Sequence, residues 1–339
     1  MIGNHKLTIV IIGRNEESAI GKCVEAALRA SEQFGGAEMI YVDSHSTDRT
    51  VSIVKSYGVR VLTLSPDLRR TPSAGRFMGS RYATGDFVLF LDADTLVYPD
   101  FLTPALEFFA HDETIAGING STDDYNADGE RVFGIEERFE NTAEVRWLRG
   151  PCCLYRREAL LIVGSFNPNL ATEEEAELGL RLIRAGWKLK IIPGDMACHT
   201  RCYHGDSIRS IISTFRRDIR SKRVGEITRT IAYAVRAGNG LAFCWLRLKT
   251  TIFFVAWVIA LVAAGMMPAP LYPWLAVTFL VLFGGSIIYA KKRSLSQSLL
   301  FVPAKILNLV DILAGLHKII LIPKNGDRGG RVNDGLEAK

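Results

Sequence analysis

The chain has 339 residues, which is enough for one large domain with a smaller appendage or for two domains of medium size. Its 41 Lys and Arg residues against 36 Asp and Glu residues give a net charge of +5, and 48% of all residues are hydrophobic. Its six cysteines lack the density and regular spacing of a disulfide framework, which excludes a small disulfide-stabilised secreted domain.

Strands and helices are predicted to alternate through the N-terminal part of the chain. Leu7–Ile12 is rich in β-branched residues and ends at Gly13, a pattern typical of a buried strand in a parallel sheet. The alternation predicts an α/β fold, Rossmann-like, with a mostly parallel sheet and helices on both faces. The other predicted strands are Glu38–Val42, Val59–Leu64 and Phe87–Leu91, and the helices between them are 17–34, 48–57 and Ser73–Tyr82.

The next part of the chain gives a weaker pattern. Residues 118–150 look irregular and polar, and Lys188–Ile192 is predicted to be a strand. Thr172–Ala185 has the pattern of a helix, with Thr172 as its N-cap and acidic residues in its first turn. We expect the soluble domain to comprise residues 1–205.

Polar side chains follow three of the predicted strands at the point where each strand ends. Asn15 and Glu16 follow the first strand, Asp43 follows the second, and Asp92-Ala93-Asp94 follows the fourth. Ligands of such sheets bind beyond the carboxyl ends of the strands, so the three groups are expected to form one site.

The C-terminal part of the chain has the composition of a membrane anchor. Residues 250–267 and 271–290 carry no charge, and each run is about long enough to span a bilayer. Basic residues precede the first run and follow the second, which predicts a hairpin (250–290) with both ends in the cytoplasm. Two buried helices of a soluble core are the alternative. Within the last segment, 291–339, residues 299–322 favour an amphipathic interfacial helix over a third span, followed by a polar tail.

A basic segment, 206–249, comes before the hairpin. Between Arg201 and Lys249 there are eleven Lys or Arg residues and three acidic ones. Such a segment next to an apolar run indicates contact with anionic membrane lipids. No nucleic-acid partner is expected, because no aromatic-interleaved or known nucleic-acid motif accompanies the charge.

Asp92 and Asp94 carry the clearest chemical signal. Two carboxylates one residue apart at a strand end can hold a hard divalent cation, Mn²⁺ or Mg²⁺, which in turn neutralises a diphosphate. The alternative, a solvated acidic turn, is less favoured because the pair follows a buried strand.

Five segments, in the same order, resemble those of family 2 glycosyltransferases, of the membrane-anchored bacterial type. The resemblance covers about residues 7–200 and implies the GT-A fold, followed here by C-terminal transmembrane or interfacial helices. The segments are VIIGRNEES, YVDSHSTDRT, SAGRFMGSRYATGDFVLFLDADT, RGPCCLYRREAL and TEEEAELGLRLIRAGWKLKIIP.

The resemblance also implies roles for individual residues. The base and ribose of a nucleotide would be bound by Asn15, Glu16 and Asp43, with Arg76 near the nucleotide. Asp92 would contact the ribose or the water shell of the metal, and Asp94 and His199 would bind the metal itself. Family members usually have Glu-Asp at the start of the later helix, and alignment places Glu174 and Glu175 there. Glu175 is therefore the predicted catalytic base, with Glu174 as the alternative.

These roles predict an inverting, metal-dependent transfer of one sugar from a UDP- or GDP-sugar to a lipid-linked glycan acceptor. The expected location is the cytoplasmic face of a bacterial inner membrane, in polysaccharide or glycolipid assembly. The transmembrane helices also offer a surface for homo-oligomer formation. The alternatives are sugar transfer to polyprenyl phosphate, nucleotidyl transfer, and a non-catalytic membrane scaffold.

Overall fold

A computed structural model describes residues 6–125, 131–132, 140–202, 225–249, 251–252, 255–256, 259, 309–310 and 312–316. The chain divides into two compact units, one made of Met1–Tyr203 with Pro323–Lys339 and the other of His204–Ile322. The predicted boundaries of the four segments stay a prediction, and the two units are described separately.

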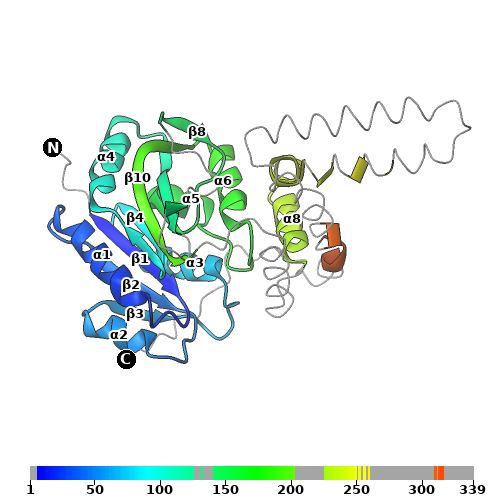
Figure 1. Ribbon diagram of the computed structural model, residues 1–339. Helices are drawn as coiled ribbons and strands as arrows, with labels where there is room; N and C mark the ends of the chain where they lie inside the picture. Colours follow the sequence, from blue (N-terminus) through cyan, green and yellow to red (C-terminus); the bar gives the residue numbers. More distant parts are fainter. Residues whose placement is uncertain are drawn as a thin grey trace, which may run out of the picture. The chain divides into compact units, whose positions relative to one another are not determined.

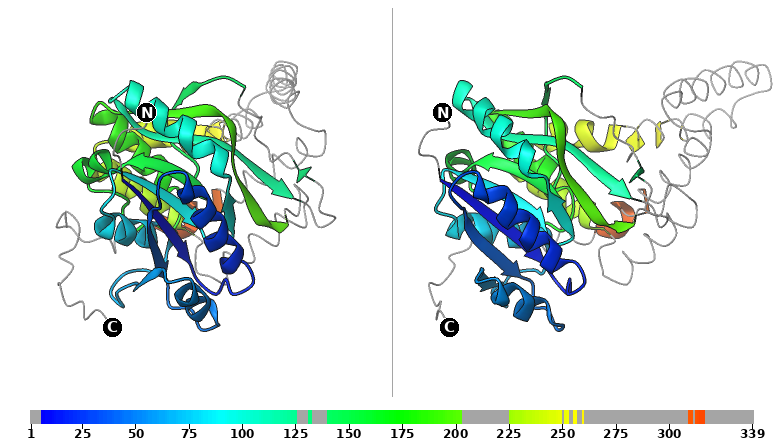
Figure 2. Two further views of the ribbon diagram at one scale, coloured as in Figure 1. Left: turned by 90° about the vertical axis from the view of Figure 1, so that its left-hand side faces the viewer. Right: turned by 60° about the vertical axis from the view of Figure 1, so that its left-hand side comes forward.

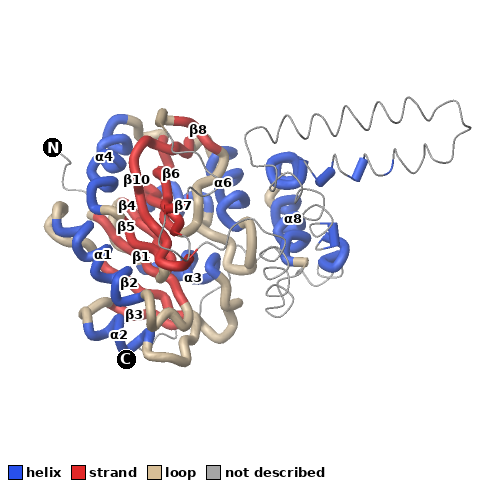
Figure 3. Tube along the Cα trace, viewed as in Figure 1, coloured by secondary structure: helices blue, strands red, loops and turns tan. Residues whose placement is uncertain are grey.

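A single sheet forms the centre of the first unit (Figures 1 and 3). Its N-terminal half consists of parallel strands in the order β3-β2-β1-β4, as predicted. The order then continues β9-β6-β10-β5, and the turned views of Figure 2 show both halves as one continuous layer. The strands are β1 (Leu7–Gly13), β2 (Glu38–Asp43), β3 (Arg60–Thr63), β4 (Phe87–Asp92), β5 (Thr95–Val97), β6 (Ile115–Tyr125), β7 (Arg131–Val132), β8 (Ala143–Val145), β9 (Cys152–Arg156) and β10 (Lys188–Cys202).

The whole sheet is mixed rather than mostly parallel. β9 runs antiparallel to both β4 and β6, which it separates, while β10 is parallel to β6 and antiparallel to β5. An apolar run in a sequence indicates a buried strand but carries no information on its direction. The predicted strand Lys188–Ile192 is therefore found as part of β10, whereas the antiparallel pairings in this half of the sheet differ from the prediction.

Helices cover both faces of this sheet, as predicted. Alternate side chains of β1 point to opposite faces, so Ile9 and Ile11 belong to one buried cluster and Val10 and Ile12 to the other. The first cluster includes residues of α1, α2 and α4, and the second includes residues of α3, α5 and α6 (Figure 1). The helices are α1 (Ile20–Glu32), α2 (Thr50–Ser56), α3 (Pro72–Tyr82), α4 (Pro99–His111), α5 (Arg157–Val163) and α6 (Glu174–Arg184).

Two local predictions are wrong. Residues 118–125 are not irregular, because they form most of β6, where the polar side chains of Asn119, Ser121 and Asp123 are buried. Thr172 does not cap α6: the N-cap is Glu173, which has a left-handed backbone (φ 58°) and makes no side-chain capping hydrogen bond. The first two residues of the helix, Glu174 and Glu175, both contact Arg76, as described below.

The second unit contains α8 (Glu226–Arg236), α9 (Gly240–Phe243) and a π-helical turn, Cys244–Leu248. Gly225 lies against Gly315, where an added Cβ would be 2.5 Å from the Gly315 Cα, and Thr228 donates a hydrogen bond to the Ile312 carbonyl at 2.9 Å. The start of α8 therefore packs on a segment more than 80 residues further along the chain.

No helix in the described parts of the chain is long and apolar enough to cross a membrane. The predicted span 271–290 lies wholly outside the described residues, and so does most of 250–267. The predicted hairpin and the interfacial helix over 299–322 stay predictions.

The packing of α3 on β1 can be tested at Gly79, where an added Cβ would overlap the fully buried Val10 side chain. We expect Gly79→Ala to lower stability by about 1–3 kcal/mol through overpacking, although alanine is the better helix former. The midpoint of thermal unfolding of the purified protein measures this. Gly21→Ala in α1 is the matched control, because the nearest atom to its Cβ, the Tyr57 hydroxyl, is 3.4 Å away. Equal effects of the two substitutions would contradict the packing argument.

Candidate active site

Two interlocked loops at the carboxyl ends of β1 and β2 carry the residues predicted to bind a nucleotide. Asn15 has a left-handed backbone (φ 58°), and its side-chain oxygen accepts the Thr47 N–H at 2.8 Å. Both carboxylate oxygens of Asp43 accept the Ser46 N–H, at 3.2 and 3.0 Å. The Glu16 N–H donates to the Thr50 hydroxyl at 2.8 Å. The structure thus places Asn15, Glu16 and Asp43 together, and their binding of a nucleotide stays a prediction.

The Asp92-Ala93-Asp94 turn is fixed through its backbone. The Asp92 N–H donates to the Pro151 carbonyl and the Ala93 N–H to the Ile12 carbonyl, both at 2.9 Å. The buried Ala93 packs on Gly13, where an added Cβ would be only 2.6 Å from the Ala93 Cβ. Small residues at these two positions therefore let the acidic turn lie directly on the end of β1.

Cys23 of α1 contacts the backbone of the same turn. Its thiol is buried and donates to the Asp92 carbonyl at 3.7 Å. Burial, followed by the charges of Asp94 and Asp92, raises the pKa of the Cys23 thiol. Since it stays protonated, Cys23 acts as a small hydrogen-bond donor under the two carboxylates rather than as a nucleophile.

The guanidinium of Arg76 lies at the centre of the site. Its side chain is 2% exposed, and it belongs to α3. One nitrogen, Nη2, donates to Asp92 at 2.9 Å and to the Gly150 carbonyl at 3.0 Å. The other, Nη1, donates to Glu174 at 2.9 Å and to Glu175 at 3.3 Å. One buried cation therefore joins the first aspartate of the acidic turn to both candidate bases.

The two glutamates share this cation and titrate as a pair. Burial, together with the neighbouring charge of Glu174, raises the pKa of Glu175 to about 8, although the Arg76 charge opposes the shift. Burial also raises the pKa of Glu174. The pair is therefore expected to exchange a proton near pH 8, which makes Glu175 a candidate general base close to that pH.

Gly150 provides the space that the Glu175 carboxylate occupies. A Cβ at position 150 would overlap a Glu175 oxygen and would lie 2.9 Å from Arg76 Nη2. Only glycine fits at this position. Its presence in RGPCCLYRREAL was the available signal.

His199 lies across a strand pair from the acidic turn. β10 pairs antiparallel with β5 so that His199 is opposite Thr95, the residue that follows Asp94. Two carboxylates and an imidazole are suitable ligands for a divalent cation such as Mn²⁺, so the chemistry of the donor set fits a metal. No three His, Cys, Asp or Glu side chains within the described ranges are grouped so as to hold a metal ion. The assignment of Asp92, Asp94 and His199 as ligands stays a prediction.

Comparison with known proteins identifies the family. The model of glycosyl transferase family 2 matches residues 8–161. The model of glycosyl transferase family group 2 matches residues 87–288, and this second match alone covers more than half of the chain. The chain belongs to the family 2 glycosyltransferases. The acidic turn, the Arg76 cluster and Gly150 all lie within the matched residues.

Individual relatives of this glycosyltransferase are distant. It is 29% identical over 92 residues to 4,4'-diaponeurosporenoate glycosyltransferase of Staphylococcus haemolyticus, covering 26% of this chain and 24% of the relative. It is 26% identical over 202 residues to beta-monoglucosyldiacylglycerol synthase of a Synechocystis species, covering 55% of this chain and 42% of the relative. The aligned part thus spans less than half the length of either relative.

Among solved structures, the glycosyltransferase is similar to mannosyltransferase PcManGT from Pyrobaculum calidifontis, which was determined in complex with GDP-Man and Mn²⁺. The TM-score is 0.58 at 20% sequence identity, and the match covers 91% of this chain and 88% of the other. This similarity confirms a GT-A-like fold.

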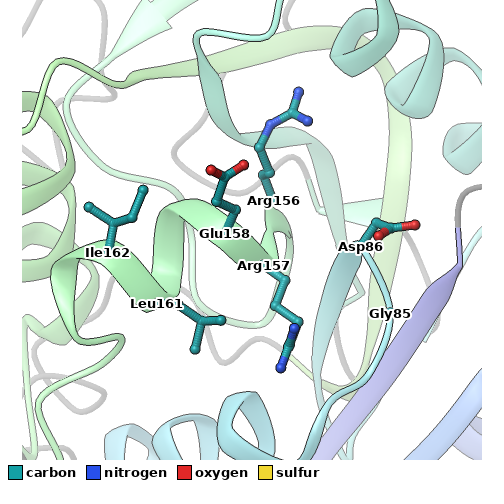
Figure 4. A pocket seen from close by; sticks show the side chains of 7 residues that line it. All are labelled: Gly85, Asp86, Arg156, Arg157, Glu158, Leu161 and Ile162. Carbon is teal, nitrogen blue, oxygen red and sulfur yellow. The ribbon is translucent and has the colours of Figure 1, made fainter.

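Figure 4 shows the side chains that line a cavity of about 390 Å³. It is lined by Gly85 and Asp86, which precede β4, and by residues 156–158, Leu161 and Ile162 around α5. Asp86 and Asp92 are at opposite ends of β4, about 20 Å apart at the usual rise per residue. This cavity is therefore distinct from the glycosyltransferase site.

The raised pKa of Glu175 predicts that stability depends on pH. The folded protein holds the Glu175 proton up to about pH 8, whereas the group's ordinary pKa is 4.5. Because the folded state binds this proton more tightly, stability should fall as the pH rises from about 4.5 to about 8. Glu175→Gln mimics the protonated form and should flatten this decline in the midpoint of thermal unfolding. Glu158→Gln, an exposed residue on α5, is the control with the same charge change and should leave the decline unchanged.

Proposed function

We propose that the protein is an inverting, metal-dependent glycosyltransferase that moves one sugar from a nucleotide-sugar to a lipid-linked glycan acceptor. The observation that carries this proposal is the Arg76 guanidinium, which joins Asp92 to Glu174 and Glu175. Asp92 belongs to the acidic turn that would bind the donor, and the glutamates would serve the acceptor. With these roles, the donor-binding and acceptor-activating groups would be joined by a single side chain, Arg76.

The geometry supports a division of roles. Glu175 would accept the proton of the acceptor hydroxyl as its oxygen attacks the anomeric carbon. Arg76 and Glu174 would hold the Glu175 carboxylate in place. A cation bound by Asp92, Asp94 and His199 would offset the charge of the leaving diphosphate. A single displacement of this kind inverts the anomeric centre.

The relatives support the donor and metal assignments. PcManGT has the same fold, and its structure was determined with GDP-Man and Mn²⁺. A nucleotide-sugar donor and Mn²⁺ or Mg²⁺ as the cation are therefore the proposed partners here, with UDP- and GDP-sugars both candidates.

The acceptor and the location are proposed from the C-terminal half. One relative is named for a glucosyldiacylglycerol product, which favours a lipid acceptor. In the second unit, Leu241 and Trp245 have exposed apolar side chains, and Arg247 and Lys249 follow them closely. Exposed aromatic and apolar groups next to basic residues are suited to the surface of an anionic membrane. With the uncharged runs 250–267 and 271–290, this supports the cytoplasmic face of a bacterial inner membrane.

The alternative acceptor is polyprenyl phosphate. A phosphate acceptor is already ionised and needs little help from a base, so the presence of the Glu174–Glu175 pair favours a hydroxyl. Membership of the glycosyltransferase family favours sugar transfer over nucleotidyl transfer or a scaffold role.

Activity assays test the proposal directly. Membranes carrying the protein are incubated with UDP- and GDP-sugars and lipid extract, with and without Mn²⁺. We expect transfer that requires the metal, loss of transfer in Asp94→Ala, and a decrease of about 10²–10⁴-fold in Glu175→Gln. Glu158→Gln is the control and should retain the wild-type rate. Metal-independent transfer, or full activity of Asp94→Ala, would show that the mechanism is wrong.

Membrane attachment has its own test. If 250–290 forms a transmembrane hairpin, the full chain should stay in the membrane pellet after a wash in alkaline carbonate, which releases proteins bound only at the surface. Recovery of the protein in the supernatant would contradict the hairpin. Attachment at the membrane surface alone would then be the remaining explanation for binding.

A further inference from the structure

The loop Arg149–Cys152 contacts both parts of the proposed active site. The Gly150 carbonyl accepts a hydrogen bond from Arg76 at 3.0 Å, and the Pro151 carbonyl accepts the Asp92 N–H at 2.9 Å. At Gly150 the loop lies so close to Glu175 that no side chain fits between them. The position of this loop therefore determines where Glu175 and Asp92 lie relative to each other.

Asn119 of β6 holds the loop at both of its ends. Its side-chain NH₂ donates to the Cys152 carbonyl, and its side-chain oxygen accepts the Arg149 N–H. The residue is 1% exposed, and its backbone is paired with Ile191 of β10 in the middle of the sheet. A side chain anchored in the rigid sheet thus spans the stretch that contains Gly150 and Pro151.

The two partners of Asn119 require different chemistry. A backbone N–H needs an acceptor and a carbonyl needs a donor, and an amide side chain supplies one of each. An aspartate of the same shape could still accept the Arg149 N–H, but its carboxylate would face the Cys152 carbonyl without a proton to donate. Asn119→Asp therefore keeps the shape of the side chain but loses one of its two hydrogen bonds to the loop. A loss of activity in this variant would come from the lost hydrogen bond and not from a change in packing volume.

We propose that Asn119 is a positioning residue of the sugar-transfer reaction, which acts by fixing the Arg149–Cys152 loop against Glu175 and Asp92. The inference rests on the proposed function, because it needs Glu175 as the base. Asn119 itself contacts neither Glu175 nor Asp92 among its described hydrogen bonds, so its effect is transmitted through Gly150 and Pro151.

The test compares Asn119→Asp and Asn119→Ala with Thr8→Val in the full-length protein. Thr8 is buried at the opposite end of the sheet, where its hydroxyl donates to Glu38 at 2.7 Å and accepts the Gly85 N–H at 2.9 Å. Thr8→Val therefore removes two buried hydrogen bonds without touching the loop, and serves as the control for a general loss of stability.

We expect both Asn119 variants to lower kcat for sugar transfer by about 10–100-fold, since small misplacements of catalytic groups cost about this much. Binding of the donor's nucleoside diphosphate with Mn²⁺ should weaken by a smaller factor than kcat falls, because the Asn15 and Asp43 loops are not affected and Asp92 is the one proposed donor-site residue that contacts the loop. Thr8→Val should lower the midpoint of thermal unfolding and keep the wild-type kcat.

A second measurement follows the loop itself. Cys152 and Cys153 are fully buried, and Cys152 is the residue whose carbonyl Asn119 binds. Labelling with N-ethylmaleimide, located by mass spectrometry, should be faster at these cysteines in Asn119→Asp than in the wild type or Thr8→Val.

The outcomes separate the two proposals. If Glu175→Gln transfers sugar at the full rate, the proposed base is wrong. If Glu175→Gln is inactive but Asn119→Asp keeps the wild-type kcat, the inference about Asn119 alone is overturned. It is equally overturned if the Asn119 variants lose only as much kcat as Thr8→Val.

Discussion

The buried guanidinium of Arg76 is the interaction on which the rest of the site depends. An isolated charge in a protein interior is costly, and this one is stabilised by three carboxylates and a carbonyl that come from separate parts of the chain. Burial, followed by the neighbouring charge of Glu174, raises the pKa of Glu175, and burial raises the pKa of Glu174, so a bound proton offsets the excess negative charge of three acids around one cation. The same electrostatics that let the cluster be buried therefore give Glu175 the proton affinity of a base.

Close backbone packing is what lets these groups meet. Gly13 under Ala93 brings the acidic turn onto β1, and Gly150 brings its loop onto Glu175. At each glycine, the space that a side chain would fill is occupied by another residue of the site. Larger residues at positions 13 and 150 would therefore push the carboxylates away from Arg76. The rigid sheet behind them keeps these distances short, because β1, β4 and β9 are buried on both faces.

The sequence was sufficient for the parts of the fold that depend on local pattern. The strands β1 to β4 follow from continuous apolar runs, and Asp43 and Asp92 are found at their carboxyl ends as expected. It was not sufficient for β6, whose buried Asn119, Ser121 and Asp123 resemble a polar loop until their partners are known. The Arg76 cluster was also out of reach, since it joins residues up to 99 positions apart, and only tertiary packing shows which polar residues share a partner.

The length of Glu175 and the absence of a side chain at Gly150 belong together. The family resemblance implies the shorter Asp at this helix position, and the glutamate found here has one more methylene group. That extra length carries the carboxylate into the space beside Gly150, where it lies 3.3 Å from Arg76 Nη1. An aspartate on the same backbone would end about one bond short of this contact. Arg76 would then be paired with the carboxylates of Glu174 and Asp92 but not with residue 175. The longer side chain of the proposed base is thus accommodated by a loop residue without a side chain.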